Sequence, residues 1–225
     1  MIQARPGLAS KVLLLLSLAP SVGTGQTRVS GTGLVSLFDH QVDIGYGVEE
    51  STGLLLGAEG AVTFRSRLTL AARAAGGSLS TDAAGVESRD VGEVGIQAGV
   101  GLMRWLALRG GATWRSYSTT VARQRWTIVD AAAEARLDFT TSAVQGVVRA
   151  GLLPIVSVKG LPRPDVALTA AAGIEYRSGA VTAGLFYGLE RYDFPDRGAG
   201  RRLEQVSTLT LRFGARRGGD HAAQR

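Results

Sequence analysis

The 225-residue sequence contains no cysteine. This absence excludes disulfide bonds, Cys-ligated metal sites, thiol catalysis and lipid attachment through an N-terminal cysteine. Histidine is also scarce, because only His40 and His221 occur in the chain. A histidine-based active site would therefore have to use one of these two residues.

The chain also lacks an apolar run of the roughly 20 residues that a membrane-spanning helix needs. Its longest apolar stretch, Val12 to Ala19, is much shorter and follows two basic residues. Gly23 and Gly25 then supply the small residues typical of a cleavage site. Residues 1–25 are therefore predicted to be a signal peptide, with an uncleaved anchor or a buried helix as the alternatives.

After the signal segment, the apolar residues alternate with polar ones, which is typical of β-strands. The 31 glycines further argue against long helices. Two alanine-rich stretches, 131–135 and 170–172, leave a local helix as an alternative. The apolar phase also switches near Val129, which indicates a β-bulge there or a loop that continues to Trp126. Ten alternating segments are counted, at residues 34–48, 54–64, 68–74, 93–102, 106–115, 129–139, 144–152, 165–177, 181–190 and 208–213.

Four short, turn-like breaks recur at Ser66, Arg104, Thr141 and Gly179, with spacings of 38, 37 and 38 residues. Each interval holds two alternating segments and one longer polar loop. This rhythm predicts an all-β, up-and-down antiparallel transmembrane barrel with short turns at one end and longer loops at the other. Ten strands are expected, and eight if the first and last hairpins are misread. The longer loops are expected at residues 79–89, 117–125, 157–164 and 193–202.

The 14 aromatic residues concentrate near the two ends of the expected strands. Two aromatic girdles that flank an aliphatic band are typical of a barrel in a bilayer. The apolar faces are therefore predicted to contact lipid and the polar faces to line the lumen. The predicted girdle residues are Phe64, Trp105, Trp114, Trp126, Phe139, Tyr176, Tyr192 and Phe213.

The segment Leu209-Thr210-Leu211-Arg212-Phe213 resembles the assembly signal at the end of small bacterial outer-membrane β-barrels, the porin-like and OmpA–OmpX-type class. It departs from that signal because the upstream glycine is absent and 12 residues follow Phe213. The resemblance covers roughly residues 30–213. It implies a barrel over 26–213 and residence in the outer membrane after export. The Gly/Arg-rich residues 214–225 are predicted to be a disordered tail. It also implies outer-membrane lipids, lipopolysaccharide and the barrel-assembly machinery as partners.

Charges of both signs fall on the face predicted to point inward. Their near balance predicts Arg–carboxylate pairs that fill the lumen or set the width of a narrow pore. Inward glycines at 57, 99, 111, 151 and 173 are expected to leave room for water. The principal lumen charges are Glu59, Arg73, Glu93, Arg109, Asp130, Glu134, Arg136, Arg149, Glu175 and Glu190. Further inward charges are expected at Asp43, Arg115, Asp138, Arg177, Glu204 and Arg212.

The longer loops carry several basic residues. We expect Arg123, Arg125, Arg163 and Arg201 to contact lipid phosphates at the outer leaflet.

No enzymatic activity, cofactor or metal is expected. His40 is predicted to face lipid in the periplasmic half, and His221 lies in the tail. The net charge of +6 is scattered along the chain, which argues against a nucleic-acid partner. The predicted function is structural, or that of a narrow passive channel for small solutes. The alternatives are a soluble periplasmic ligand-binding barrel and an outer-membrane lipid-modifying enzyme.

Overall fold

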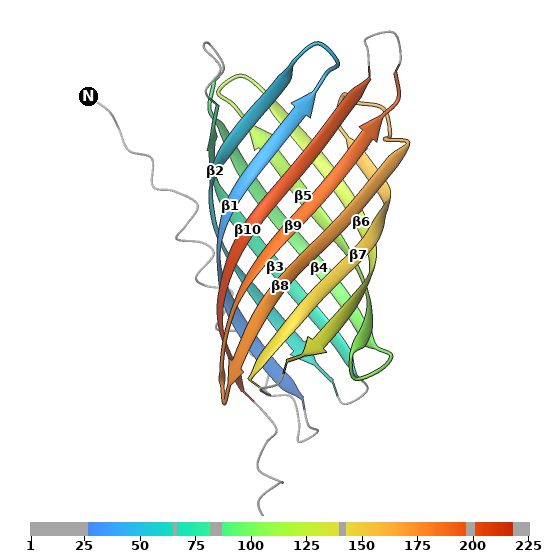
Figure 1. Ribbon diagram of the computed structural model, residues 1–225. Coiled ribbons are helices and arrows are strands. Elements are labelled where there is room, and N and C mark those ends of the chain that lie inside the picture. Colours follow the sequence, from blue (N-terminus) through green and yellow to red (C-terminus); the bar gives the residue numbers. More distant parts are fainter. Residues whose placement is uncertain (1–26, 65–66, 82–86, 140–142, 197–200, 218–225) are drawn as a thin grey trace, which may run out of the picture.

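The computed structural model describes residues 27–64, 67–81, 87–139, 143–196 and 201–217. These residues form a closed antiparallel barrel of ten strands, as the sequence predicted (Figure 1). Consecutive strands pair with each other, and β1 closes the barrel against β10. Among the described residues, no helix is long and apolar enough to cross a membrane. The strands are β1 (Arg28–Asp43), β2 (Val48–Thr63), β3 (Leu68–Ser80), β4 (Arg89–Gly101), β5 (Leu106–Ser118), β6 (Arg123–Asp138), β7 (Val144–Val158), β8 (Val166–Ser178), β9 (Val181–Phe194) and β10 (Arg202–Arg217).

All four predicted short breaks join strands at the same end of the barrel, which we call the turn end. The β8–β9 turn is the tightest, and Gly179 adopts a φ of 55° there, which glycine tolerates without strain. Ser66 and Thr141 themselves lie outside the described residues. β1 begins and β10 finishes at the turn end as well (Figure 1).

The boundaries of the first and the last strand differ from the prediction. The expected single strand 34–48 is interrupted by a turn over 44–47, where Ile44 N–H donates to Gly47 O at 3.1 Å. Asp43, expected in the lumen, instead accepts a hydrogen bond from Gly45 N–H at 2.8 Å. The sequence does not reveal this Asx-type turn, because the apolar phase continues through it. At the other end, β10 continues to Arg217, so residues 214–217 are strand; residues 218–225 lie outside the described part.

The alanine-rich stretches are strands within β6 and β8, not helices. The predicted irregularity near Val129 exists, but the extra residue lies on the neighbouring strand. Val129 pairs with Ile155 and Ala131 pairs with Leu152, so β7 carries a bulge that contains Pro154. β6 therefore keeps its alternation through the irregularity.

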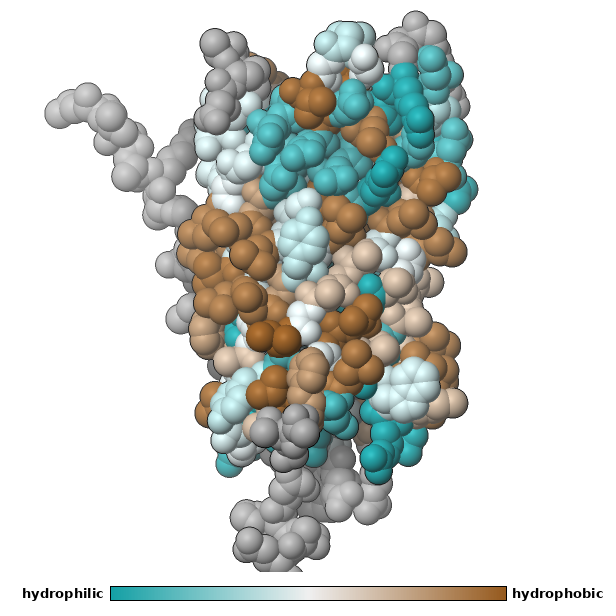
Figure 2. Space-filling model, in the orientation of Figure 1, coloured by the Kyte–Doolittle hydropathy of each residue, from teal (hydrophilic) through white to brown (hydrophobic). Residues whose placement is uncertain are grey.

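An apolar band crosses the face of the barrel that Figure 2 shows. Leu56, Ile96 and Leu152 expose 60, 54 and 60% of their surface from outward positions on different strands. A continuous apolar surface of this extent is unfavourable in water and favourable in hydrocarbon. The strands, at 13–16 residues, exceed the roughly 9–11 residues that span a bilayer. The protein is therefore an integral β-barrel of the outer-membrane type.

Four of the five inward glycines lie close to a neighbouring strand, which is not the role expected from the sequence. Gly99 differs, because a Cβ there would lie 3.4 Å from Arg109 Cγ, an ordinary contact distance. A Cβ at Gly151 would lie 2.4 Å from the carbonyl oxygen of Ala131, and one at Gly57 would lie 2.5 Å from that of Ala74. Gly111 and Gly173 are similarly close to the backbone of a neighbouring strand. These glycines permit close approach of adjacent strands rather than leaving space for water.

Candidate functional site

The ten principal charges predicted for the lumen all line one cavity of about 650 Å³ inside the barrel. Arg67 and Arg104 line the cavity at the turn end of the barrel. Toward the loop end, its lining includes the buried apolar side chains of Phe38 and Val206. We call this cavity the vestibule. Its lining residues are Glu59, Arg73, Glu93, Arg109, Asp130, Glu134, Arg136, Arg149, Glu175 and Glu190 together with further polar and apolar residues.

An Arg115 network lies at the inner limit of the vestibule. Arg115 contacts Glu93 at 2.7 Å and Glu190 at 2.8 Å, and its side chain is 3% exposed. Arg73 also contacts Glu93 at 2.7 Å, and the Tyr192 hydroxyl donates to Glu190 at 2.6 Å. Two guanidinium groups thus face two carboxylates, and the network is balanced in charge.

A second cluster, the Glu134 cluster, lies closer to the turn end. Glu134 is buried and contacts Arg109 at 2.7 Å, Arg149 at 2.8 Å and Arg136 at 3.1 Å. The three arginines come from β5, β6 and β7, which are consecutive in the barrel. Arg109 also donates to Gln97 at 3.0 Å. One carboxylate therefore faces three guanidinium groups, and the cluster carries a net charge of +2.

The remaining predicted lumen charges form separate pairs or stand alone. Arg212 contacts Glu59 at 2.6 Å, and Arg177 pairs with Glu175 along β8. Asp138 lies outside the lining of the vestibule and accepts a hydrogen bond from Gln145. Asp130 also lines the vestibule, and it forms no ion pair with a described residue.

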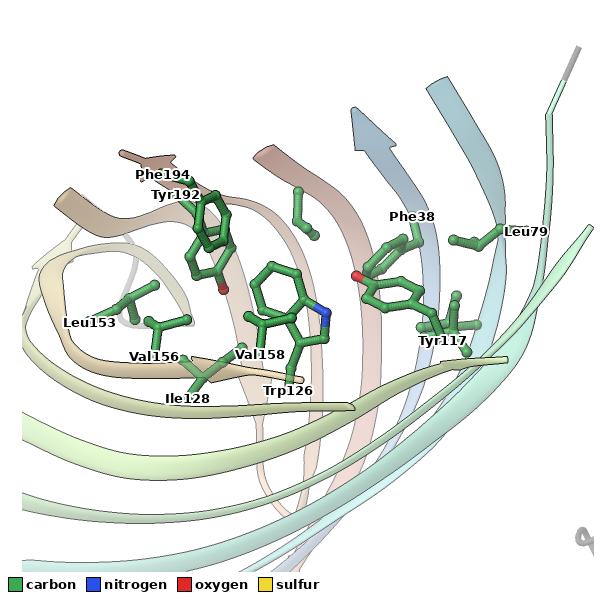
Figure 3. Packing of buried hydrophobic residues seen from close by; sticks show 13 residues of the cluster. Phe38, Leu79, Tyr117, Trp126, Ile128, Leu153, Val156, Val158, Tyr192 and Phe194 are labelled. Atoms are coloured by element: carbon green, nitrogen blue, oxygen red, sulfur yellow. The ribbon is translucent and has the colours of Figure 1, made fainter. Parts of the chain in front are cut away.

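Buried aromatic side chains fill the lumen in its loop-end half (Figure 3). Trp126 lies at the centre, with ring centroids 5.0 Å from Tyr192, 6.2 Å from Phe194 and 6.3 Å from Tyr117. These residues come from β5, β6 and β9, so the contacts cross the lumen. We call this cluster the aromatic plug; its members are Phe38, Leu55, Leu79, Val91, Tyr117, Trp126, Ile128, Leu153, Val156, Val158, Tyr192, Phe194 and Val206.

The plug corrects two of the eight predicted girdle residues. Trp126 and Tyr192 are 2 and 0% exposed and point inward, so neither contacts lipid. The sequence predicts both on the lipid face because they lie near the loop ends of their expected strands. The other six lie on the exposed outer surface, Trp114 among them; the five near the turn end are Phe64, Trp105, Phe139, Tyr176 and Phe213.

The prediction that His40 faces lipid in the periplasmic half is also wrong. It points inward in the loop-end half, is 2% exposed, and contacts Glu204 Oε2 through Nε2 at 3.0 Å. Its ring stacks on Tyr117 with centroids 4.9 Å apart. Arg202 also pairs with Glu204, at 2.6 Å. The apolar phase of β1 was therefore assigned to the wrong face, because apolar residues line the lumen at this level.

The four arginines predicted to contact lipid phosphates all lie at the loop end. Arg123 donates to Ser118 Oγ at 3.0 Å, and Arg163 donates to the carbonyl of Pro154. Arg201 pairs with Asp193, and this carboxylate raises the pKa of Arg201. Arg125 is exposed at the start of β6.

The described residues contain no group of three or more His, Cys, Asp or Glu side chains that could hold a metal ion.

No protein-family model matches the sequence, and no curated protein matches it. Solved barrels are similar in structure. The translocator domain of the autotransporter NalP from Neisseria meningitidis shares 14% identity, with 92% of this chain and 93% of that chain covered and a TM-score of 0.45. An outer-membrane channel from Pseudomonas putida F1 shares 8% identity, with 89 and 100% covered and a TM-score of 0.49. Ail of Yersinia pestis shares 13% identity, with 86 and 100% covered and a TM-score of 0.35. At these values the likeness concerns the barrel fold alone.

Proposed function

We propose that this protein is a structural barrel of the outer membrane whose lumen does not conduct in the described conformation. The aromatic plug carries this proposal. The vestibule is lined at the turn end by Arg67 and Arg104, whereas Trp126 and Tyr192 are in contact across the lumen in the loop-end half. A continuous pore would need an opening at both ends.

The composition of the plug explains why it would stop ions as well as larger solutes. Trp126, Phe194 and Val156 are each at most 3% exposed, so little water reaches this level of the lumen. An apolar constriction excludes water and opposes the passage of a hydrated ion. The balanced Arg115 network beneath the plug adds a second layer of cross-lumen contacts.

The surroundings of the barrel are part of the same proposal. Residues 1–25 direct export, the barrel-assembly machinery recognises the strand that contains Phe213, and the turn end faces the periplasm. At the opposite end, Arg123, Arg125, Arg163 and Arg201 contact the phosphates of lipopolysaccharide. No enzymatic step is assigned to the barrel.

Single-channel recording of the purified protein in planar bilayers tests this proposal. Folded insertion is verified first by heat-modifiable migration on gels and by extraction with detergent only. Silence at high protein load is expected. Steady openings of the wild-type protein would overturn the structural function and favour the narrow passive channel. Release of the protein with the periplasmic fraction would instead support a soluble binding barrel.

A further inference from the structure

The vestibule has an excess of positive charge that its own carboxylates do not neutralise. Eleven arginines and six carboxylates line it. The Arg115 network and the pairs Arg212–Glu59 and Arg177–Glu175 are balanced. The excess positive charge therefore belongs to the Glu134 cluster and to the opening of the vestibule at the turn end, which we call the mouth. Asp130 is the one further carboxylate in the lining.

The mouth contributes four of the arginines. Arg216 donates to the carbonyl of Gly179 at 2.9 Å, and Arg67 donates to that of Leu102 at 3.5 Å. Among the described residues, neither these two nor Arg28 and Arg104 form an ion pair with a carboxylate. Basic side chains at an entrance with low-dielectric walls raise the local concentration of anions.

Within the Glu134 cluster, the carboxylate has no capacity left for further donors. Five guanidinium nitrogens lie within 3.1 Å of its two oxygens, two from Arg109, two from Arg136 and one from Arg149. A carboxylate offers about four acceptor positions, whereas three guanidinium groups carry about fifteen N–H donors. The Nε of Arg149 has no partner among the described residues. Donors therefore remain for a second oxyanion.

We propose that the vestibule is a binding site for a small organic or inorganic oxyanion, a carboxylate or a phosphate, that enters from the turn end. Arg109, Arg136 and Arg149 hold the oxyanion, since guanidinium groups match both carboxylate and phosphate geometry. The cavity of about 650 Å³ lies within the range of small-molecule sites, roughly 300–1,000 Å³. This inference goes beyond the structural function, because binding in the vestibule does not require passage through the plug.

Isothermal titration of the detergent-solubilised full chain tests this inference. The probes are inorganic phosphate, succinate as a dicarboxylate, and glucose as a neutral solute, all at constant ionic strength. We expect one or both anions to bind and glucose not to bind, and the stronger anion identifies the class of ligand. No heat from either anion at millimolar concentration would overturn the proposal.

Two substitutions in the Glu134 cluster are expected to act in opposite directions. Arg149→Ala removes donors while Glu134 keeps two partners, so the dissociation constant should rise about tenfold. Glu134→Gln removes the carboxylate that competes for these donors, so this substitution should lower the dissociation constant. Arg191→Ala, at an exposed position in the loop-end part of β9 and outside the lining of the vestibule, is the matched control and should leave binding unchanged. If folded Arg149→Ala and Glu134→Gln both bind like the wild type, the cluster is structural only and the proposal is wrong.

Discussion

Arg115 of β5 forms a bidentate ion pair with Glu190 of β9 across the lumen. Its Nη1 donates to Oε2 at 2.8 Å, and its Nη2 donates to Oε1 at 3.2 Å. Three strands separate β5 from β9 along the barrel wall. The contact therefore braces opposite sides of the barrel, which the hydrogen bonds between neighbouring strands do not do.

Replacement of Glu190 by Gln should destabilise the barrel strongly. The Arg115 side chain is 3% exposed, and removing one of its two carboxylate partners leaves a buried charge only partly neutralised. The expected loss in the free energy of unfolding is about 3 kcal/mol, measured by urea unfolding in detergent micelles. Glu175→Gln is the control: its partner Arg177 lies two residues away on the same strand, and the loss should stay below about 1 kcal/mol. Equal losses would show that bracing across the lumen contributes nothing.

The aromatic plug should be the barrier to ion flow. Trp126→Ala combined with Phe194→Ala removes two rings that contact each other in the lumen, and openings in planar bilayers are expected. Each single substitution should also cost about 3–5 kcal/mol of stability, because it leaves a cavity in a packed cluster. Trp114→Ala, on the outer face, should remain silent. A folded but silent double variant would place the barrier elsewhere.

The turn-end half of the barrel follows the sequence prediction closely, whereas the loop-end half does not. Toward the turn end, apolar residues point outward and charged residues inward, so alternation alone assigns Glu134 and Arg149 to the lumen. Toward the loop end, both faces carry apolar residues, and alternation no longer identifies which face meets lipid. Trp126 has the same parity as Asp130 and Glu134, and this shared parity was the available signal that Trp126 points inward.

The sequence also does not predict which arginine pairs with which carboxylate, and the reason is different. Arg115 and Glu190 are 75 residues apart, and their contact depends on the tilt of the strands and the closure of the barrel. The bulge on β7 was equally hidden, since the visible phase switch lay on β6 at Val129 while the extra residue lies beside Pro154.

A charge on the outer face should be costly in proportion to its depth in the bilayer. Ile96 lies near the middle of β4 and is 54% exposed on the lipid side, so Ile96→Arg should lower stability by about 2–4 kcal/mol. Gln205→Arg, on the outer face near the loop end of β10, should cost at most about 1 kcal/mol. Urea unfolding in lipid vesicles measures both values. Similar small losses would mean that the apolar band does not contact hydrocarbon.

Gly151 should be intolerant of even one added methyl group. A Cβ at Gly151 would lie 2.4 Å from the Ala131 carbonyl oxygen and 2.6 Å from the Ala132 Cβ, so β6 and β7 must separate to accept it. Gly151→Ala is expected to lower the free energy of unfolding by about 1–3 kcal/mol. Gly60→Ala provides the contrast: nothing lies within 4 Å of its Cβ position, and restricting the unfolded chain should leave stability unchanged or raise it by up to about 1 kcal/mol. Parallel urea titrations measure the difference. If Gly151→Ala is as stable as Gly60→Ala, close approach between β6 and β7 is not what keeps glycine at this position.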